Sequence, residues 1–212
     1  ILHENIYDEF IARFKLAMND IKVGPAKDPA TYLSALIDED SLKKTLRAIE
    51  DLKQTYKATR IGVKVHQAGL SKDLYPNIDF QGYYFPPTLI EGLPPEAEVS
   101  CKELFAPVVA AFKVKDIQEA VELSNSLNVA LTGGIYSRNP NVIKYVKENL
   151  EVGNLYINRS ITGAIVGRHP FGGYKLSGIG SKAGGPDYLL QFADPVTIVE
   201  NTLRRGYSPD LE

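Results

Sequence analysis

The chain has 212 residues, and its 24 basic against 26 acidic side chains give a formal charge of −2. This balance argues against a nucleic-acid-binding domain, which carries a concentrated basic excess. No stretch approaches the roughly 20 apolar residues that span a bilayer. The single cysteine, Cys101, excludes an internal disulfide and favours a reducing, cytoplasmic location. Because the chain begins with Ile1 and not Met, we expect it to be a piece of a longer protein.

Two helices are expected in the first part of the chain. Apolar residues recur at helical spacing over residues 6–18, and Gly24-Pro25 ends the pattern. A second helix should begin at Asp40-Ser41, which can cap it. Its expected buried face consists of Leu42, Leu46, Ile49 and Leu52. Alternation over residues 59–66 favours a strand, whereas residues 67–104 are rich in Pro, Gly and Tyr and predict no long element.

From residue 106 onward, strands and helices alternate regularly. The pattern predicts five elements: strand 106–114, helix 117–127, strand 131–137, helix 141–150 and strand 154–158. Asp116 is suited to cap the first of these helices, and Asn139-Pro140 the second. Strand–helix–strand units with short connections form right-handed crossovers, so we expect an α/β fold in which an open parallel sheet has flanking helices.

Residues 159–186 interrupt this alternation with eight glycines in 28 residues. The segment follows the carboxyl end of a parallel strand, where open α/β sheets place their ligands. A long loop inside a compact domain is usually functional, so we expect a binding role here. The remaining tail predicts a short helix and then a strand with alternating apolar residues.

No catalytic residue and no metal site emerge from the side chains alone. The three histidines, His3, His66 and His169, stand apart and lack the spacing of metal ligands. Cys101 precedes a strand and has no identifiable base, so a structural role is favoured over a nucleophilic one. Neither a phosphate-binding loop nor a serine-nucleophile elbow is present in the sequence.

Several short stretches do resemble the signatures of one known family. KELFAPV at 102–108 resembles EEIFGPV, and HPFGG at 169–173 resembles PFGG, which are both signatures of the aldehyde dehydrogenase superfamily. Three further stretches follow in the family's order and spacing: GYYFPPTLIEGLP at 82–94, LTGGIYSRN at 131–139 and VGNLYIN at 152–158. ITGAIVGRHPFGG followed by KLSGIGSKAGGPDYL looks like the 1-pyrroline-5-carboxylate dehydrogenase branch. The resemblance covers nearly the whole chain.

This resemblance implies a parent enzyme that uses NAD to oxidise L-glutamate γ-semialdehyde to glutamate in proline catabolism. In the family, the nucleophilic cysteine and the general-base glutamate lie upstream of a strand whose end resembles Ile1-Leu2-His3. The chain is therefore expected to be the C-terminal, catalytic-domain portion, inactive by itself and with weak or no NAD binding. Residues 1–186 would belong to that domain, and residues 187–212 would form a C-terminal helix and an oligomerisation strand.

The resemblance also assigns roles to five residues. Glu103 matches the carboxylate that binds the nicotinamide ribose, and Phe105 matches the ring that packs against the nicotinamide. Gly163 and Ala164 match the loop whose backbone N–H groups hold the substrate's α-carboxylate. Phe171 matches the aromatic residue that packs on the aliphatic part of the substrate. A solvated carboxylate, core aromatic residues and an ordinary turn are the alternatives for these positions.

Other positions and functions stay open at this point. Ala106 stands where the family usually has Gly, and the sequence assigns no role to Arg159 or His169. The family match predicts a homo-oligomer assembled through residues 195–204. One alternative function is oxidation of another aldehyde that carries a carboxylate, such as succinate semialdehyde. A second is that the chain is a stand-alone module that only binds or assembles.

Overall fold

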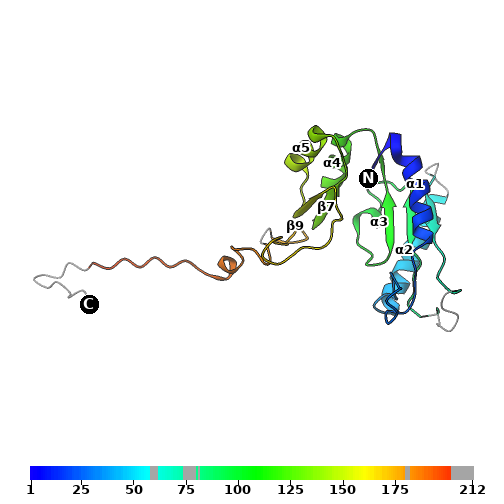
Figure 1. Cartoon of the computed structure of the whole chain (residues 1–212), viewed down its shortest axis with the longest axis horizontal. Coiled ribbons are helices and arrows are strands. Elements are labelled where there is room, and N and C mark those ends of the chain that lie inside the picture. The colour runs from blue at the N-terminus through cyan, green and yellow to red at the C-terminus, as the bar shows by residue number, and fades with distance from the viewer. Residues whose placement is uncertain (58–61, 74–79, 81, 180–181, 202–212) are drawn as a thin grey trace, which may run out of the picture. The chain divides into compact units, whose positions relative to one another are not determined.

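A computed structural model of the chain describes residues 1–57, 62–73, 80, 82–179 and 182–201 (Figure 1). The chain divides into two compact units. Ile1–Asn128 and Ser137–Glu151 form the first unit, and Val129–Tyr136 and Val152–Glu212 form the second. No boundary between the units falls after residue 186, and the division expected there stays a prediction.

Among the described residues, the α-helices all lie in the first unit, and short strands occur in both units. The helices are α1 Glu4–Asn19, α2 Glu39–Lys57, α3 Glu98–Cys101, α4 Ile117–Asn125, α5 Pro140–Asn149 and the 3₁₀ helix Leu189–Phe192. The strands are β1 Leu2–His3, β2 Lys64–Gln67, β3 Thr88–Glu91, β4 Val108–Ala111, β5 Lys113–Val114, β6 Val129–Ala130, β7 Thr132–Ile135, β8 Asn154–Ile157 and β9 Tyr174–Lys175. The expected α/β class, with parallel strand pairs and flanking helices, is confirmed.

The helix starts follow from the capping residues. The Asp116 carboxylate accepts a hydrogen bond from the backbone N–H of Glu119 at 2.8 Å and caps α4, as expected. Asn139 caps α5 in the same way through the N–H of Asn141 at 2.9 Å. Pro140 follows at the first helical position, where its missing N–H costs nothing. Both caps were predicted correctly from the sequence.

The first unit is built on a three-stranded sheet in the order β2–β3–β4. The central strand β3 runs antiparallel to β2 and parallel to β4, with Thr88 opposite Val108. The sequence reading missed β3, because only four residues separate Pro87 from Gly92 and so short a run shows no periodicity. The strand expected over 59–66 begins only at Lys64, and its residues 59–61 lie outside the described part of the chain.

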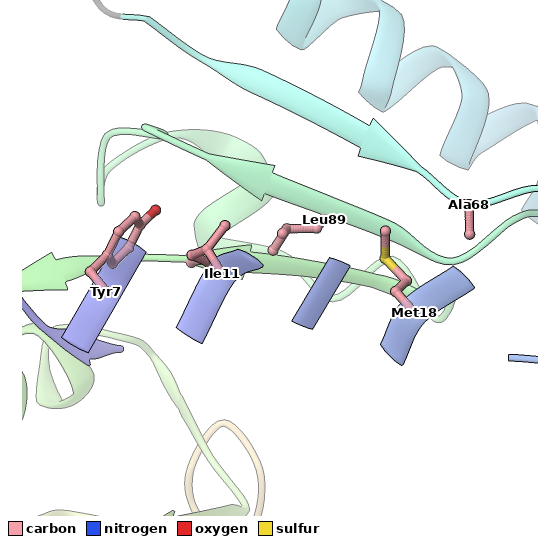
Figure 2. Packing of buried hydrophobic residues seen from close by; sticks show 6 residues of the cluster. Tyr7, Ile11, Met18, Ala68 and Leu89 are labelled. Atoms are coloured by element: carbon pink, nitrogen blue, oxygen red, sulfur yellow. The ribbon is translucent and has the colours of Figure 1, made fainter. Parts of the chain in front are cut away.

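Helices cover the two faces of this sheet. Figure 2 shows side chains of α1, among them Ile11 and Met18, packing toward Leu89 of β3. On the other face, Ile90 of β3 packs in a cluster with Ile49 and Leu52 of α2. The two hydrophobic clusters therefore lie on opposite faces of the sheet, which is a helix–sheet–helix arrangement.

The expected buried face of α2 needs one correction. Leu46 is 51% exposed, whereas Thr45 is fully buried and donates its hydroxyl to the Ser41 carbonyl oxygen at 2.8 Å. The buried stripe runs through Thr45, Ile49 and Leu52, spaced four and three residues apart. Leu46 lies about 100° around the helix from Thr45 and so falls beside this stripe.

The strands over residues 106–158 are divided among separate sheets and do not join in one sheet. The run 106–114 divides at Phe112 into β4, which pairs with β3, and β5, which pairs in parallel with β1. The later strands β7 and β8 pair in parallel with each other in the second unit. In the second unit, the short strands β6 and β9 also form an antiparallel pair. The parallel direction was therefore predicted correctly, but the strands belong to separate small sheets.

The tail differs from the expected helix and strand. The helix is present as one 3₁₀ turn over Leu189–Phe192, but residues 193–201 form neither a helix nor a strand (Figure 1). Residues 202–204 of the expected oligomerisation strand lie outside the described residues. No helix in the described part of the chain is long and apolar enough to cross a membrane.

A half-buried polar network joins α1 to the end of β3. The Glu91 carboxylate is 12% exposed and lies 2.8 Å from both Lys15 Nζ and His66 Nε2. It also accepts a hydrogen bond from Tyr7 Oη at 3.2 Å. Burial by itself would raise the pKa of Glu91, but the Lys15 charge and these hydrogen bonds outweigh it and hold the pKa below its usual range. Burial, together with the Glu91 charge, raises the pKa of Tyr7 to about 12.

We expect Glu91→Gln to lower the free energy of unfolding by about 1–3 kcal/mol at pH 7, because Lys15 and His66 lose their carboxylate partner. Because the pKa of Glu91 is lowered by folding, its stabilisation is complete above its ordinary pKa of about 4.3 and disappears as the pH falls through the folded value. Urea unfolding at several pH values should therefore show the two proteins converging below pH of about 4.

Glu9→Gln is the matched control on the same helix. Glu9 pairs with Arg13 four residues away, and both side chains are at least 70% exposed, so its loss should cost less than about 0.5 kcal/mol. Equal unfolding free energies for the wild type and Glu91→Gln at pH 7 would contradict the role assigned to the network.

Candidate functional site

The five residues singled out in the sequence fall into two cavities, one in each unit. Glu103 and Phe105 line a cavity of about 670 Å³ in the first unit. Gly163, Ala164 and Phe171 line a cavity of about 320 Å³ in the second. We call these the Glu103 cavity and the Gly163 cavity and describe each by itself.

The Glu103 cavity lies between two segments far apart in the sequence. One wall is the stretch that leads from α3 into β4, residues 102–108, and the other is the loop 33–37. The backbone N–H of Leu36 donates to the Tyr83 carbonyl oxygen at 2.8 Å and fixes this loop. Ile37, on the same loop, exposes 87% of its surface although it is fully apolar. The cavity thus has an apolar edge that the described residues leave uncovered.

Glu103 brings an unpaired carboxylate to this cavity. Its neighbour Lys102 forms an ion pair with a different carboxylate, since its Nζ lies 2.6 Å from Glu98 Oε1. Among the residues that the structure describes, Glu103 has no hydrogen bond or ion pair of its own. An exposed carboxylate offers two oxygens as acceptors, so Glu103 can receive two hydroxyl groups from one ligand.

Phe105 is held in an unusual conformation beside Glu103. Its φ of 53° is left-handed, which is strained for a bulky residue, and its side chain is 76% exposed. The backbone immediately after it is firmly bound. Val108 N–H donates to the Ala106 carbonyl oxygen at 2.7 Å, and Thr88 N–H donates to that of Pro107 at 2.8 Å. The ring is therefore presented to the cavity by a rigid backbone, a type of strain that is concentrated at functional sites.

The Gly163 cavity is formed by a loop that returns over the start of β7. Its described lining consists of Thr132, Ile161, Thr162, Gly163, Ala164 and Phe171. The structure thus brings together all three residues expected to contact a substrate, although Phe171 lies seven positions beyond Ala164. Most of the lining is apolar, and its polar groups belong to the backbone and to the hydroxyl groups of Thr132 and Thr162.

Two residues that line this cavity have backbone N–H groups that could bind a ligand. Gly163 and Ala164 are exposed, and neither donates its backbone N–H to another described residue. Gly163 has a φ of 85°, a conformation that favours glycine. A left-handed residue at a turn helps successive N–H groups to converge on an anion. The geometry therefore suits a carboxylate or a similar group.

The backbone around Phe171 is held by hydrogen bonds from residues that were not predicted from the sequence. It exchanges two backbone hydrogen bonds with Ala183, at 3.0 and 2.8 Å. Asn154 donates its side-chain amide to the Pro170 carbonyl oxygen at 3.0 Å and accepts from Gly172 N–H at 3.1 Å. Lys182 contacts the same loop. The one signal for Lys182 in the sequence was its position in the glycine-rich segment 159–186.

Arg159 and His169, which the sequence left open, lie within the second unit. The Arg159 guanidinium lies 5.3 Å from the centre of the Tyr156 ring, and its Nη2 donates to the Thr162 carbonyl oxygen at 3.4 Å. His169 donates its backbone N–H to the Ile165 carbonyl oxygen at 2.6 Å. Its Nδ1 is buried without a partner among the described residues. Through its hydrogen bond to Thr162, Arg159 supports the loop that carries Gly163.

The one cysteine of the chain shows no arrangement for nucleophilic catalysis. Cys101 is exposed at the end of α3, and its thiol lies 3.5 Å from the Pro95 carbonyl oxygen. No base contacts it within the described ranges. In the same part of the chain, no three His, Cys, Asp or Glu side chains gather as a metal site would require.

Comparison with known proteins gives one consistent family. A model of the aldehyde dehydrogenase family matches residues 1–198. The 1-pyrroline-5-carboxylate dehydrogenase of Bacillus licheniformis is 38% identical over 200 residues, which are 94% of this chain and 36% of that protein.

Two solved structures support the same relationship. Proline utilization A of Bdellovibrio bacteriovorus, inactivated by N-propargylglycine, has a TM-score of 0.84 and 40% identity over 98% of this chain and 20% of its own. The 1-pyrroline-5-carboxylate dehydrogenase of Thermus with bound NAD has a TM-score of 0.78 and 34% identity over 90% of this chain and 34% of its own.

The chain spans only about a third of the length of the curated relatives that it matches. This coverage gives no support to the expectation that the chain is the C-terminal portion of such an enzyme. The family and the likeness to 1-pyrroline-5-carboxylate dehydrogenases do agree with the resemblance noted in the sequence.

Proposed function

Because the chain belongs to the aldehyde dehydrogenase family, we propose that it is part of an NAD-dependent enzyme that oxidises L-glutamate γ-semialdehyde to glutamate. The reaction would serve proline catabolism. The observation that carries this proposal is the Gly163 cavity, which is lined by an aromatic residue and by two residues whose backbone N–H groups have no acceptor in the described part of the chain. The relatives named 1-pyrroline-5-carboxylate dehydrogenase support the choice of substrate.

The Gly163 cavity would bind the end of the substrate that does not react. The N–H groups of Gly163 and Ala164 would donate to the α-carboxylate, and hydrogen bonds to a charged acceptor are the stronger ones. Phe171 would pack on the aliphatic carbons of the same molecule. A substrate without a carboxylate would leave both donors unmatched, so the cavity would select for acidic aldehydes.

The Glu103 cavity fits the nicotinamide end of NAD. The unpaired Glu103 carboxylate can accept the two hydroxyl groups of a ribose, and the exposed Phe105 ring offers a flat apolar surface beside it. When bound, NAD supplies the hydride acceptor of the reaction. The groups in this chain only bind and orient it, and we propose that the isolated chain binds NAD weakly and does not catalyse the oxidation.

We expect Glu103→Gln in the full-length enzyme to lower kcat/KM for NAD by about 10- to 150-fold, because a charge-assisted hydrogen bond contributes about 1.5–3 kcal/mol. Initial rates at varied NAD would measure this. Glu96→Gln is the matched control, since that exposed carboxylate lies seven residues earlier and does not line the cavity. Similar losses for both variants would count against a specific role for Glu103.

The carboxylate site is tested by Ala164→Pro in the full-length enzyme, which removes one backbone donor. We expect kcat/KM for glutamate semialdehyde to fall about 10- to 150-fold. A simple aliphatic aldehyde, which has no carboxylate, should be affected much less. The comparison matters because proline can also distort the loop, which would slow both substrates alike. An undiminished rate with glutamate semialdehyde would refute the assignment.

Succinate semialdehyde remains the competing substrate, because it also carries a carboxylate and aliphatic carbons. Steady-state rates of the full-length enzyme with both aldehydes would separate the two. A higher kcat/KM for succinate semialdehyde would overturn the proposed substrate while leaving the family unchanged.

We further propose that residues 195–204 form a contact between copies of the enzyme. Val196, Ile198 and Val199 each expose at least 79% of their surface, which is unusual for neighbouring apolar residues in a tail. Replacing these apolar residues with charged ones should therefore prevent assembly. Light scattering of Ile198→Asp/Val199→Asp should give a smaller mass than the wild type, whereas Leu176→Asp, at an exposed residue outside the tail, should not. An unchanged mass for the double variant would contradict the contact.

A further inference from the structure

We propose that Lys182 is a positioning residue that holds the aromatic wall of the Gly163 cavity, an inference that rests on the function proposed for that cavity. Lys182 Nζ donates to two backbone carbonyl oxygens, that of Gly153 at 2.6 Å and that of Gly172 at 2.5 Å. Gly172 directly follows Phe171. The lysine therefore joins the start of β8 to the loop that carries the ring.

A cation stabilises the close approach of the Gly153 and Gly172 carbonyl groups. Gly153 and Gly172 approach so closely that a side chain on Gly153 would overlap the Gly172 carbonyl oxygen. Two carbonyl oxygens directed at one point repel each other, and the Lys182 ammonium supplies hydrogen bonds to both. The Tyr174 ring lies 4.8 Å from Nζ and adds a cation–π contact.

The site holds the ammonium although burial opposes its charge. Lys182 is half-buried, and desolvation lowers its pKa from the usual lysine value. No carboxylate lies within ion-pair distance among the described residues, and the ammonium instead contacts the two carbonyl oxygens and the Tyr174 ring. A surface lysine with only a solubilising role would not have this environment.

Lys182 acts on the cavity through Phe171. Ala183, the next residue along the chain, pairs its backbone with Phe171. Lys182 itself binds the carbonyl oxygen of Gly172, the residue after Phe171. Lys182 and Ala183 together thus fix Phe171 and Gly172 at three hydrogen bonds. Lys182 itself does not line the cavity, so its influence on a substrate passes through the position of the ring.

The experiment is a double-mutant cycle in the full-length enzyme with Lys182→Met and Phe171→Ala. Methionine keeps most of the lysine volume and removes every donor. We expect Lys182→Met to raise the KM for glutamate semialdehyde about 10-fold or more and to change kcat less than about threefold, since lost packing weakens ground state and transition state alike. The KM for NAD should stay unchanged.

The double variant gives the decisive result. If Lys182 acts through Phe171, the KM of Lys182→Met/Phe171→Ala should equal that of Phe171→Ala within about twofold. Independent, multiplying effects would overturn the inference. Lys182→Arg, which keeps the charge and several donors, should restore most of the substrate affinity. Lys115→Met is the control, because Lys115 is exposed and its ammonium contacts no partner in the described residues.

A readout without substrate separates this inference from the proposed function. In Lys182→Met, the backbone amide of Phe171 should exchange with solvent at least about 10-fold faster, because the loop loses its attachment. If Lys182→Met does not fold, Lys182→Gln, which keeps one amide donor group, takes its place. A wild-type enzyme that does not oxidise glutamate semialdehyde would refute the function. An active wild type with unchanged exchange and KM in the variant would refute the positioning role.

Discussion

Strand β3 must bury both of its faces, and the first unit is arranged around that requirement. Leu89 and Ile90 are adjacent in the chain and nearly inaccessible, and neighbouring strand residues point to opposite faces. Each contributes about 1.5–3 kcal/mol on burial, provided that a helix covers its side of the sheet. Helix α1 covers Leu89, and α2 covers Ile90. The same strand fixes the Glu103 cavity, because the buried Thr88 at its start binds Pro107 through its backbone.

Much of the second half of the fold was predictable because its signals are local. Asp116 and Asn139 cap helices through their own side chains, and these caps also mark where the neighbouring strands must end. Strand β3 was not predictable, since its role depends on partners on both sides and not on its own four residues. The break at Phe112 is of the same kind, because only the pairing of β4 with β3 and of β5 with β1 divides the run.

The candidate site divides in a similar way. Family motifs led to Glu103, Phe105, Gly163, Ala164 and Phe171, and the structure places them at two cavities. Their supporting residues were not accessible from the sequence. Asn154 lies on β8 and Lys182 lies far along the loop, and both act on backbone atoms near Phe171. Contacts from a side chain to distant backbone groups leave no pattern of residue types, because any residue provides the carbonyl oxygen.

The left-handed backbone at Phe105 has a consequence for how this chain would respond to selection for stability. Glycine adopts this conformation without strain, whereas a non-glycine residue there costs on the order of 1 kcal/mol or more. A screen that rewarded thermal stability alone would therefore favour Phe105→Gly and discard the exposed ring. A screen for turnover would retain it. The two selections should therefore favour different residues at position 105.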